Sequence, residues 1–221
     1  MPGAERRTPE GWLVVPVGGA VVQRAREMRA ERDARYPNLY DEHETDLRWV
    51  GEVGEICLYR WLAERAPGAG RWIREDAAGK PDFVVHGHAV GMKTVKRQVP
   101  FRPGYTAQIT ARHAAEPVEH FFFASYEVPR RRLWLLGGIS RARFLERARR
   151  HGAGERVRPN FERILGHADG PRRWSDHGQR MRDNGRYVGT MAEFYGNRDR
   201  MVSTEALNRA FAAVREDCTV R

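Results

Sequence analysis

Residues 80–94, Lys-Pro-Asp-Phe-Val-Val-His-Gly-His-Ala-Val-Gly-Met-Lys-Thr, decide how this chain is interpreted. Two apolar runs rich in β-branched residues, 83–85 and 89–95, flank Gly87. Glycine supplies the positive φ that a tight turn requires. The stretch therefore predicts a β-hairpin.

The register of this hairpin determines which side chains share a face. With His86-Gly87 as a two-residue turn, Asp82 lies opposite Gly91. Because side chains alternate along a strand, Lys93 then lies on the same face as Asp82, whereas a slip of one residue would separate them. The hairpin thus presents a carboxylate and an ammonium together. As an ordinary surface pair they would contribute only about 0.2–1 kcal/mol.

A helical pattern precedes the hairpin at residues 47–64. Its apolar residues recur at spacings of three and four, as on the buried face of an amphipathic helix. Glu52 and Glu55 are three residues apart and lie on one flank of this helix. Gly51 and Gly54 each lower the stability of the helix by roughly 1 kcal/mol relative to alanine. Close packing of the backbone or a nearby ligand would explain why glycine is present at these positions.

Together the helix and the hairpin resemble the PD-(D/E)XK nuclease superfamily. The resemblance covers about residues 45–148 and rests on the order of three short motifs: Gly-Glu-Val-Gly-Glu at 51–55, Pro-Asp at 81–82 and Gly-Met-Lys at 91–93. It implies an α/β (α+β) fold with a restriction-endonuclease-like mixed central β-sheet flanked by helices. It also implies a metal-dependent nuclease that hydrolyses DNA phosphodiester bonds, as an endo- or an exonuclease, from a phage, restriction or defence context.

The resemblance further implies roles for individual residues. Glu55 matches the helical acid, Asp82 the central metal ligand and Lys93 the catalytic lysine, with Glu52 a weaker candidate for the helical position. Asp82, Glu55 and the Met92 carbonyl would hold Mg²⁺ or Mn²⁺, because hard cations prefer oxygen ligands. The ion would activate water and neutralise charge on the phosphoryl group, while Lys93 stabilises that charge electrostatically.

The sequence departs from the family pattern at Gly91, where an acid is expected two residues before the lysine. Three interpretations stay open. The acid has moved elsewhere, with Glu52 as a candidate, or the enzyme is weak. Alternatively, the protein is a catalytically weakened or inactive nucleic-acid-binding protein on the same fold.

Composition favours a nucleic-acid partner. Lys+Arg is 39 against 29 Asp+Glu among 221 residues, and the isoelectric point is about 10.3. A basic balance suits DNA, with RNA an open alternative. A source with a GC-rich genome, or a domain that binds a protein partner, would explain the excess of arginine too. Only Cys57 and Cys218 occur, and no apolar run approaches the roughly 20 residues of a membrane span. We expect a cytoplasmic protein without a membrane partner, and a homo-oligomer is compatible with this.

Basic side chains after the hairpin and near the C-terminus are the predicted nucleic-acid contacts. Aromatic residues Trp174 and Tyr187 are interleaved with arginines there, which suits backbone contacts with base stacking as well as it suits an ordinary basic surface. The resemblance adds a glutamine that orients substrate. The candidates are Lys96, Arg97, Arg102, Gln108, Arg172 and Arg173.

The chain divides into three predicted regions. They are an N-terminal helical segment at 1–44, a nuclease-like core at 45–150, and a basic, partly helical C-terminal extension packing on the core at 151–221. Further predicted elements are a helix at 21–35, strands at 12–17, 107–110, 121–126 and 132–137, a helix from Ser140 and a final helix from Ser203.

Overall fold

The computed structural model describes residues 6–8, 12–36, 47–74, 80–102, 105–151 and 186–190. None of the helices in these ranges is long and apolar enough to cross a membrane. In chain order the elements are β1 (Arg6–Arg7), β2 (Leu13–Pro16), α1 (Gly19–Arg35), α2 (Val50–Arg65), β3 (Gly70–Trp72), β4 (Phe83–Val85), β5 (His88–Arg97), β6 (Thr106–Thr110), α3 (Ala111–Ala114), β7 (His120–Glu127), β8 (Arg132–Ser140), α4 (Arg141–Arg147), β9 (Arg149–His151) and β10 (Arg186–Thr190).

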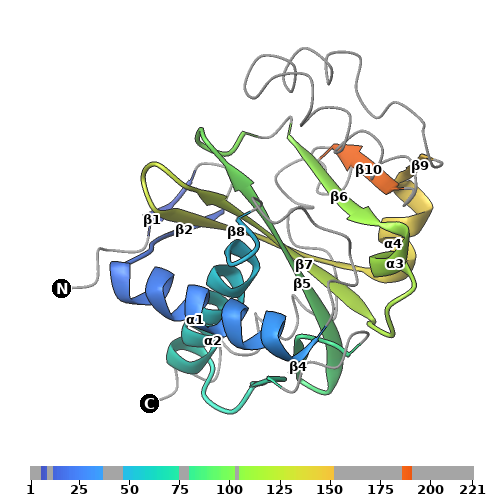
Figure 1. Ribbon diagram of the computed structural model, residues 1–221. Helices are drawn as coiled ribbons and strands as arrows, with labels where there is room; N and C mark the ends of the chain where they lie inside the picture. Colours follow the sequence, from blue (N-terminus) through green and yellow to red (C-terminus); the bar gives the residue numbers. More distant parts are fainter. Residues whose placement is uncertain are drawn as a thin grey trace, which may run out of the picture.

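A seven-stranded mixed sheet forms the centre of the fold (Figure 1). Its strand order is β1-β2-β8-β7-β5-β4-β3. β5 and β7 are parallel, and the other neighbouring pairs are antiparallel. The mixed α/β class predicted from the sequence is therefore confirmed.

Two apolar clusters cover the two faces of this sheet. One packs α1 and α2 against the sheet and contains Phe122 and Ala124 of β7. The other contains Phe121 and Phe123 of the same strand, together with Phe144 of α4. Because alternate side chains point to opposite faces, every residue of β7 is buried, as expected for a central strand covered on both sides.

Most of the elements predicted from the sequence are present. The helices at 21–35 and 47–64 correspond to α1 and α2, and the strands at 121–126 and 132–137 correspond to longer β7 and β8. The run at 12–17 contains β2. Ser140 caps α4, because its hydroxyl accepts a hydrogen bond from the Arg143 N–H at 3.2 Å.

The strand predicted at 107–110 exists as β6 but belongs to a different sheet. β5 already has β4 and β7 as its two neighbours, so β6 instead pairs with β10, which also pairs with β9. β10 comes from the predicted C-terminal extension and is thus hydrogen-bonded to a strand of the predicted core. The helix predicted from Ser203 lies outside the described residues.

Candidate functional site

The β4–β5 hairpin has the predicted register. Phe83 pairs with Val90 and Val85 with His88. His86 has φ 47° and Gly87 has φ 84°, so both turn residues adopt the left-handed conformation that suits a two-residue hairpin turn. Asp82, just before β4, is consequently brought to β5, where its Oδ2 accepts the Met92 N–H at 2.6 Å.

The carboxyl group of Asp82 experiences several charges at once. Its pKa is raised to about 7, first by burial and next by the negative charge of Glu55. The ammonium of Lys93 and the Met92 N–H act in the opposite direction, and Glu116 adds a smaller increase. Asp82 therefore lies within electrostatic reach of both predicted partners, Glu55 and Lys93.

Lys93 has a partner that the sequence did not reveal. Its Nζ donates a hydrogen bond to Oε2 of Glu116 at 2.8 Å, and the two side chains are only 13% and 9% exposed. Glu116 lies in the connector between α3 and β7, 23 residues after Lys93. The only signal in the sequence is an acid shortly before an apolar strand, which becomes informative once that strand is known to pair with β5.

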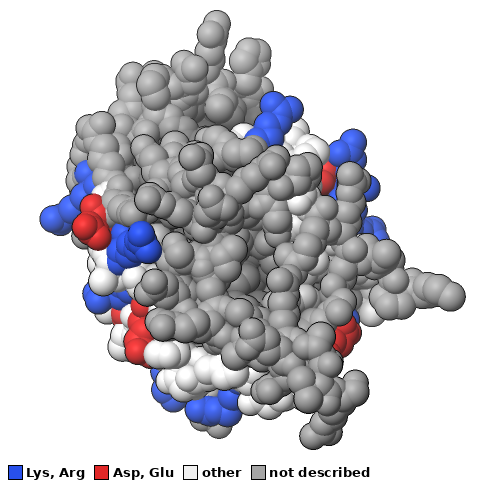
Figure 2. Space-filling model, turned by 180° about the vertical axis from the view of Figure 1, so that it is seen from behind, with Lys and Arg blue, Asp and Glu red and all other residues white. Residues whose placement is uncertain are grey.

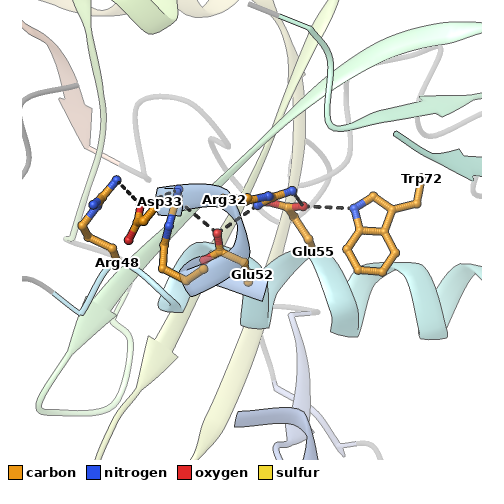
Figure 3. A network of polar contacts seen from close by, with 7 residues as sticks. Arg32, Asp33, Arg48, Glu52, Glu55 and Trp72 are labelled. Carbon is orange, nitrogen blue, oxygen red and sulfur yellow. Dashed lines mark hydrogen bonds and ion pairs between the residues drawn. The ribbon is translucent and has the colours of Figure 1, made fainter. Parts of the chain in front are cut away.

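Glu55 of α2 is firmly held by its neighbours. Arg32 of α1 donates from Nη2 to Oε2 at 2.9 Å and from Nη1 to Oε1 at 3.0 Å. The indole Nε1 of Trp72 donates to the same carboxylate at 3.0 Å. Figure 3 shows Glu55 between these two donors.

Glu52 belongs to the same polar network, which continues through α1 (Figure 3). Its Oε1 lies 2.9 Å from Arg32 Nη1 and 3.2 Å from Arg29 Nη1. The residue is 1% exposed, and burial followed by the charge of Glu55 raises its pKa. Arg29 also contacts Asp33, which in turn contacts Arg48 at 2.9 Å. Glu52 is thus engaged by the arginines of α1.

The predicted metal ligands fit a divalent cation in kind. Asp82, Glu55 and the Met92 carbonyl are oxygen donors of the type that Mg²⁺ and Mn²⁺ take. Within the described ranges, however, no three Asp, Glu, His or Cys side chains are grouped as a metal ion requires. The Glu55 carboxylate is already paired with Arg32, and Gly91 supplies no carboxylate.

Position 91 faces an apolar surface. A Cβ placed on Gly91 would lie 3.4 Å from Cγ1 of Val118 and 3.5 Å from Cδ1 of Phe121. These are ordinary van der Waals contacts, so the strand can accept a side chain there. Val118 belongs to the connector that also carries Glu116.

The predicted nucleic-acid contacts are scattered. Lys96 and Arg102 are exposed, whereas the Arg97 guanidinium lies over the rings of Tyr105 and Phe101, at 4.2 and 5.7 Å from their centroids. Gln108 lies in β6, where its backbone is opposite Val188. In the view of Figure 2, basic side chains of the described residues form separate groups near the rim. Arg172 and Arg173 lie outside the described residues.

Comparisons of the chain with family models, with curated proteins and with solved structures found no match. The assignment to the PD-(D/E)XK superfamily therefore stays a prediction, carried by the motifs and by the geometry of the hairpin.

Proposed function

We propose that this protein is a metal-dependent nuclease that hydrolyses DNA phosphodiester bonds, with Asp82, Lys93 and Glu55 as its catalytic residues. The observation that carries the proposal is the position of Asp82. It is hydrogen-bonded to the Met92 N–H and lies within electrostatic reach of both Glu55 and Lys93. This is the combination of an acid, a lysine and a helical acid that the motifs predict.

Each residue has a defined task in this proposal. A divalent ion held by Asp82, Glu55 and the Met92 carbonyl would supply an activated water and neutralise charge on the phosphoryl group. The Lys93 ammonium would stabilise negative charge that develops on the phosphoryl oxygens. Glu55 reaches such an ion only by sharing its carboxylate with Arg32 or by leaving it.

A second function, nucleic-acid binding without cleavage, is supported by specific observations. Gly91 lacks the expected acid, and Arg32 already compensates the charge of Glu55. A binding protein of this kind would hold DNA in a salt-sensitive manner, since each neutralised phosphate releases counterions. It would show no metal-dependent turnover.

The test is cleavage of linear and circular DNA, single- and double-stranded, with Mg²⁺ or Mn²⁺ and with EDTA as the metal-free arm. We expect metal-dependent cleavage that Lys93→Ala lowers by roughly 10²- to 10³-fold, the typical effect of removing one stabilising donor. Lys80→Ala is the matched control, because it removes the same charge from an exposed position just before the hairpin. Its cleavage rate should stay close to that of the wild type.

Asp82→Asn should abolish cleavage as well while leaving DNA retention at low salt largely intact. Cleavage that survives in both the Lys93 and the Asp82 variants would contradict the proposed site. DNA retention without any cleavage by the wild type would favour the binding function. A wild-type protein that retains no nucleic acid at low salt would point to a protein-partner domain instead.

A further inference from the structure

We propose that Glu116 is the residue that positions Lys93 in the site. The inference rests on the proposed nuclease function and names a residue that the motifs do not contain. Glu116 lies in the α3–β7 connector and pairs with Lys93, whereas Glu52 of α2 pairs with Arg29 and Arg32.

The first argument is the position of the connector relative to Gly91. Val118 lies at van der Waals distance from the point where a Cβ of residue 91 would be. A longer acidic side chain at position 91 would extend into the space beside Val118. The connector that carries Val118 past Gly91 also carries Glu116, which it places beside Lys93.

The second argument is that the connector is fixed at both ends. Arg141 Nε donates to the Ala114 carbonyl at 2.7 Å. Glu119 N–H donates to the Ala89 carbonyl, and the Glu119 carboxylate accepts the Ala89 N–H, both at 2.9 Å. Between these points, the Val118 N–H donates to the Glu116 carbonyl at 2.8 Å. The segment that carries Glu116 is thus held in place by contacts that do not involve Lys93.

The third argument concerns charge. Asp82 and Glu116 both act on Lys93, and His113 Nε2 lies 3.9 Å from the second carboxylate oxygen of Glu116. An ammonium that is nearly buried is stable only with a close, well-oriented partner. Glu116 provides that partner at 2.8 Å and fixes Nζ near Asp82. An error of about 1 Å in such a position can lower a rate by roughly 10²-fold.

The experiment exploits the fact that Lys80, Lys93 and Lys96 are the only lysines of the chain. Brief labelling with acetic anhydride, read by mass spectrometry, compares the half-buried Lys93 with the exposed Lys80 and Lys96 in one sample. In the wild type Lys93 should react several-fold more slowly than the other two. In Glu116→Gln it should approach them, because its ammonium has lost the ion pair.

Cleavage is measured on the same variants. Glu116→Gln should lower the rate by about 10- to 100-fold, and Glu116→Asp should keep part of it. Glu64→Gln is the matched control, because this exposed glutamate of α2 undergoes the same change of charge. Adding Gly91→Asp to Glu116→Gln should restore cleavage in part, since position 91 can accept a Cβ.

Two results would overturn the inference. One is a Glu116→Gln variant that folds and cleaves like the wild type. The other is rapid labelling of Lys93 in the wild type, which needs no variant to fold. A wild type that does not cleave DNA defeats the proposed function instead, and the labelling ratio then decides alone whether Glu116 fixes Lys93.

Discussion

Two groups of charged side chains meet near Asp82, and they differ in the ratio of basic to acidic residues. The helix cluster, on α1 and α2, consists of Arg29, Arg32, Glu52 and Glu55, two cations against two acids. The hairpin cluster consists of Asp82, Lys93 and Glu116, one cation against two acids. The helix cluster has as many cations as acids, whereas the hairpin cluster has one more acid than it has cations.

This difference separates a structural task from a chemical one. Paired buried charges hold elements together, and the contacts of Glu55 join α1, α2 and Trp72 of β3 in this way. Among the described residues, Oε2 of Glu52 and Nε of Arg29 have no hydrogen-bond partner. The pKa of Asp82 in the hairpin cluster is raised first by burial, then by the charge of Glu55 in the helix cluster, with a smaller increase from Glu116. A divalent cation would relieve that crowding, which is why the hairpin cluster is the better candidate for chemistry.

The largest predicted effect tests the structural side. Arg32→Ala leaves the Glu55 carboxylate without its bidentate partner and removes one of the two cations that contact Glu52. Breaking a buried pair from one side typically costs about 3–5 kcal/mol. We expect a loss of this size in the free energy of unfolding, measured with urea at neutral pH. Arg24→Ala is the control, because its pairs with Glu27 and Glu31 are exposed and their loss should be undetectable.

An Arg32 variant that is as stable as the Arg24 variant would contradict the structural role of the helix cluster. The glutamates of α2 would then be adequately solvated without arginine, and the helix cluster would have no structural role.

The second prediction concerns the pH dependence that Asp82 causes. Its pKa is raised from 3.8 to about 7, so the folded protein favours the protonated form. Well below pH 3.8 the Asp82 carboxyl is protonated in both the folded and the unfolded protein. Between pH 3.8 and pH 7 it ionises only in the unfolded protein, so the free energy of unfolding falls over this range. Asp82→Asn keeps an oxygen that accepts the Met92 N–H but removes this effect. At pH 8 the variant should be more stable by up to about 4 kcal/mol.

Urea unfolding of both proteins in EDTA, from pH 3.5 to pH 8, measures this difference. The two stability curves should meet at the acidic end, separate between about pH 4 and pH 7, and stay apart by a constant amount above pH 7. Curves that stay parallel throughout would show that Asp82 is not crowded by its neighbours. Adding Mg²⁺ at pH 8 should stabilise the wild type and leave Asp82→Asn unchanged if the hairpin cluster binds the ion.

The hairpin cluster was only partly predictable from the sequence. Its register follows from local features, the two apolar runs and Gly87, so the proximity of Asp82 and Lys93 could be predicted. Glu116 could not, because it reaches Lys93 only through the parallel pairing of β5 with β7. Such long-range pairing leaves no mark on the spacing of residues in the sequence.

The helix cluster shows the same limit. The flank of acids at Glu52 and Glu55 is visible in the helical periodicity. That Arg29 and Arg32 compensate it depends on how α1 packs against α2, which the periodicity of either helix alone does not specify. The same periodicity gave no reason for the two glycines of α2, and the structure explains one of them.

Gly54 lies where α2 touches β5, between the two clusters. A Cβ there would overlap Oγ1 of Thr94 and lie 2.9 Å from Cε of Met92. Gly54→Ala should therefore destabilise the protein by about 1–3 kcal/mol through overpacking, although alanine favours the helix. It should also push Glu55 away from Asp82, so the separation of the wild-type and Asp82→Asn stability curves should narrow in this background.

Gly51→Ala is the matched substitution three residues earlier, and it has the smallest predicted effect. A Cβ at Gly51 meets no atom within 4 Å, so only helix propensity changes. The variant should gain about 0.5–1 kcal/mol in urea unfolding. Opposite signs for the two alanines would show that α2 is seated on β5 at Gly54, which is what brings the helix cluster to the hairpin cluster. If both alanines stabilise the protein, α2 lies farther from β5, and the influence of Glu55 on Asp82 loses its basis.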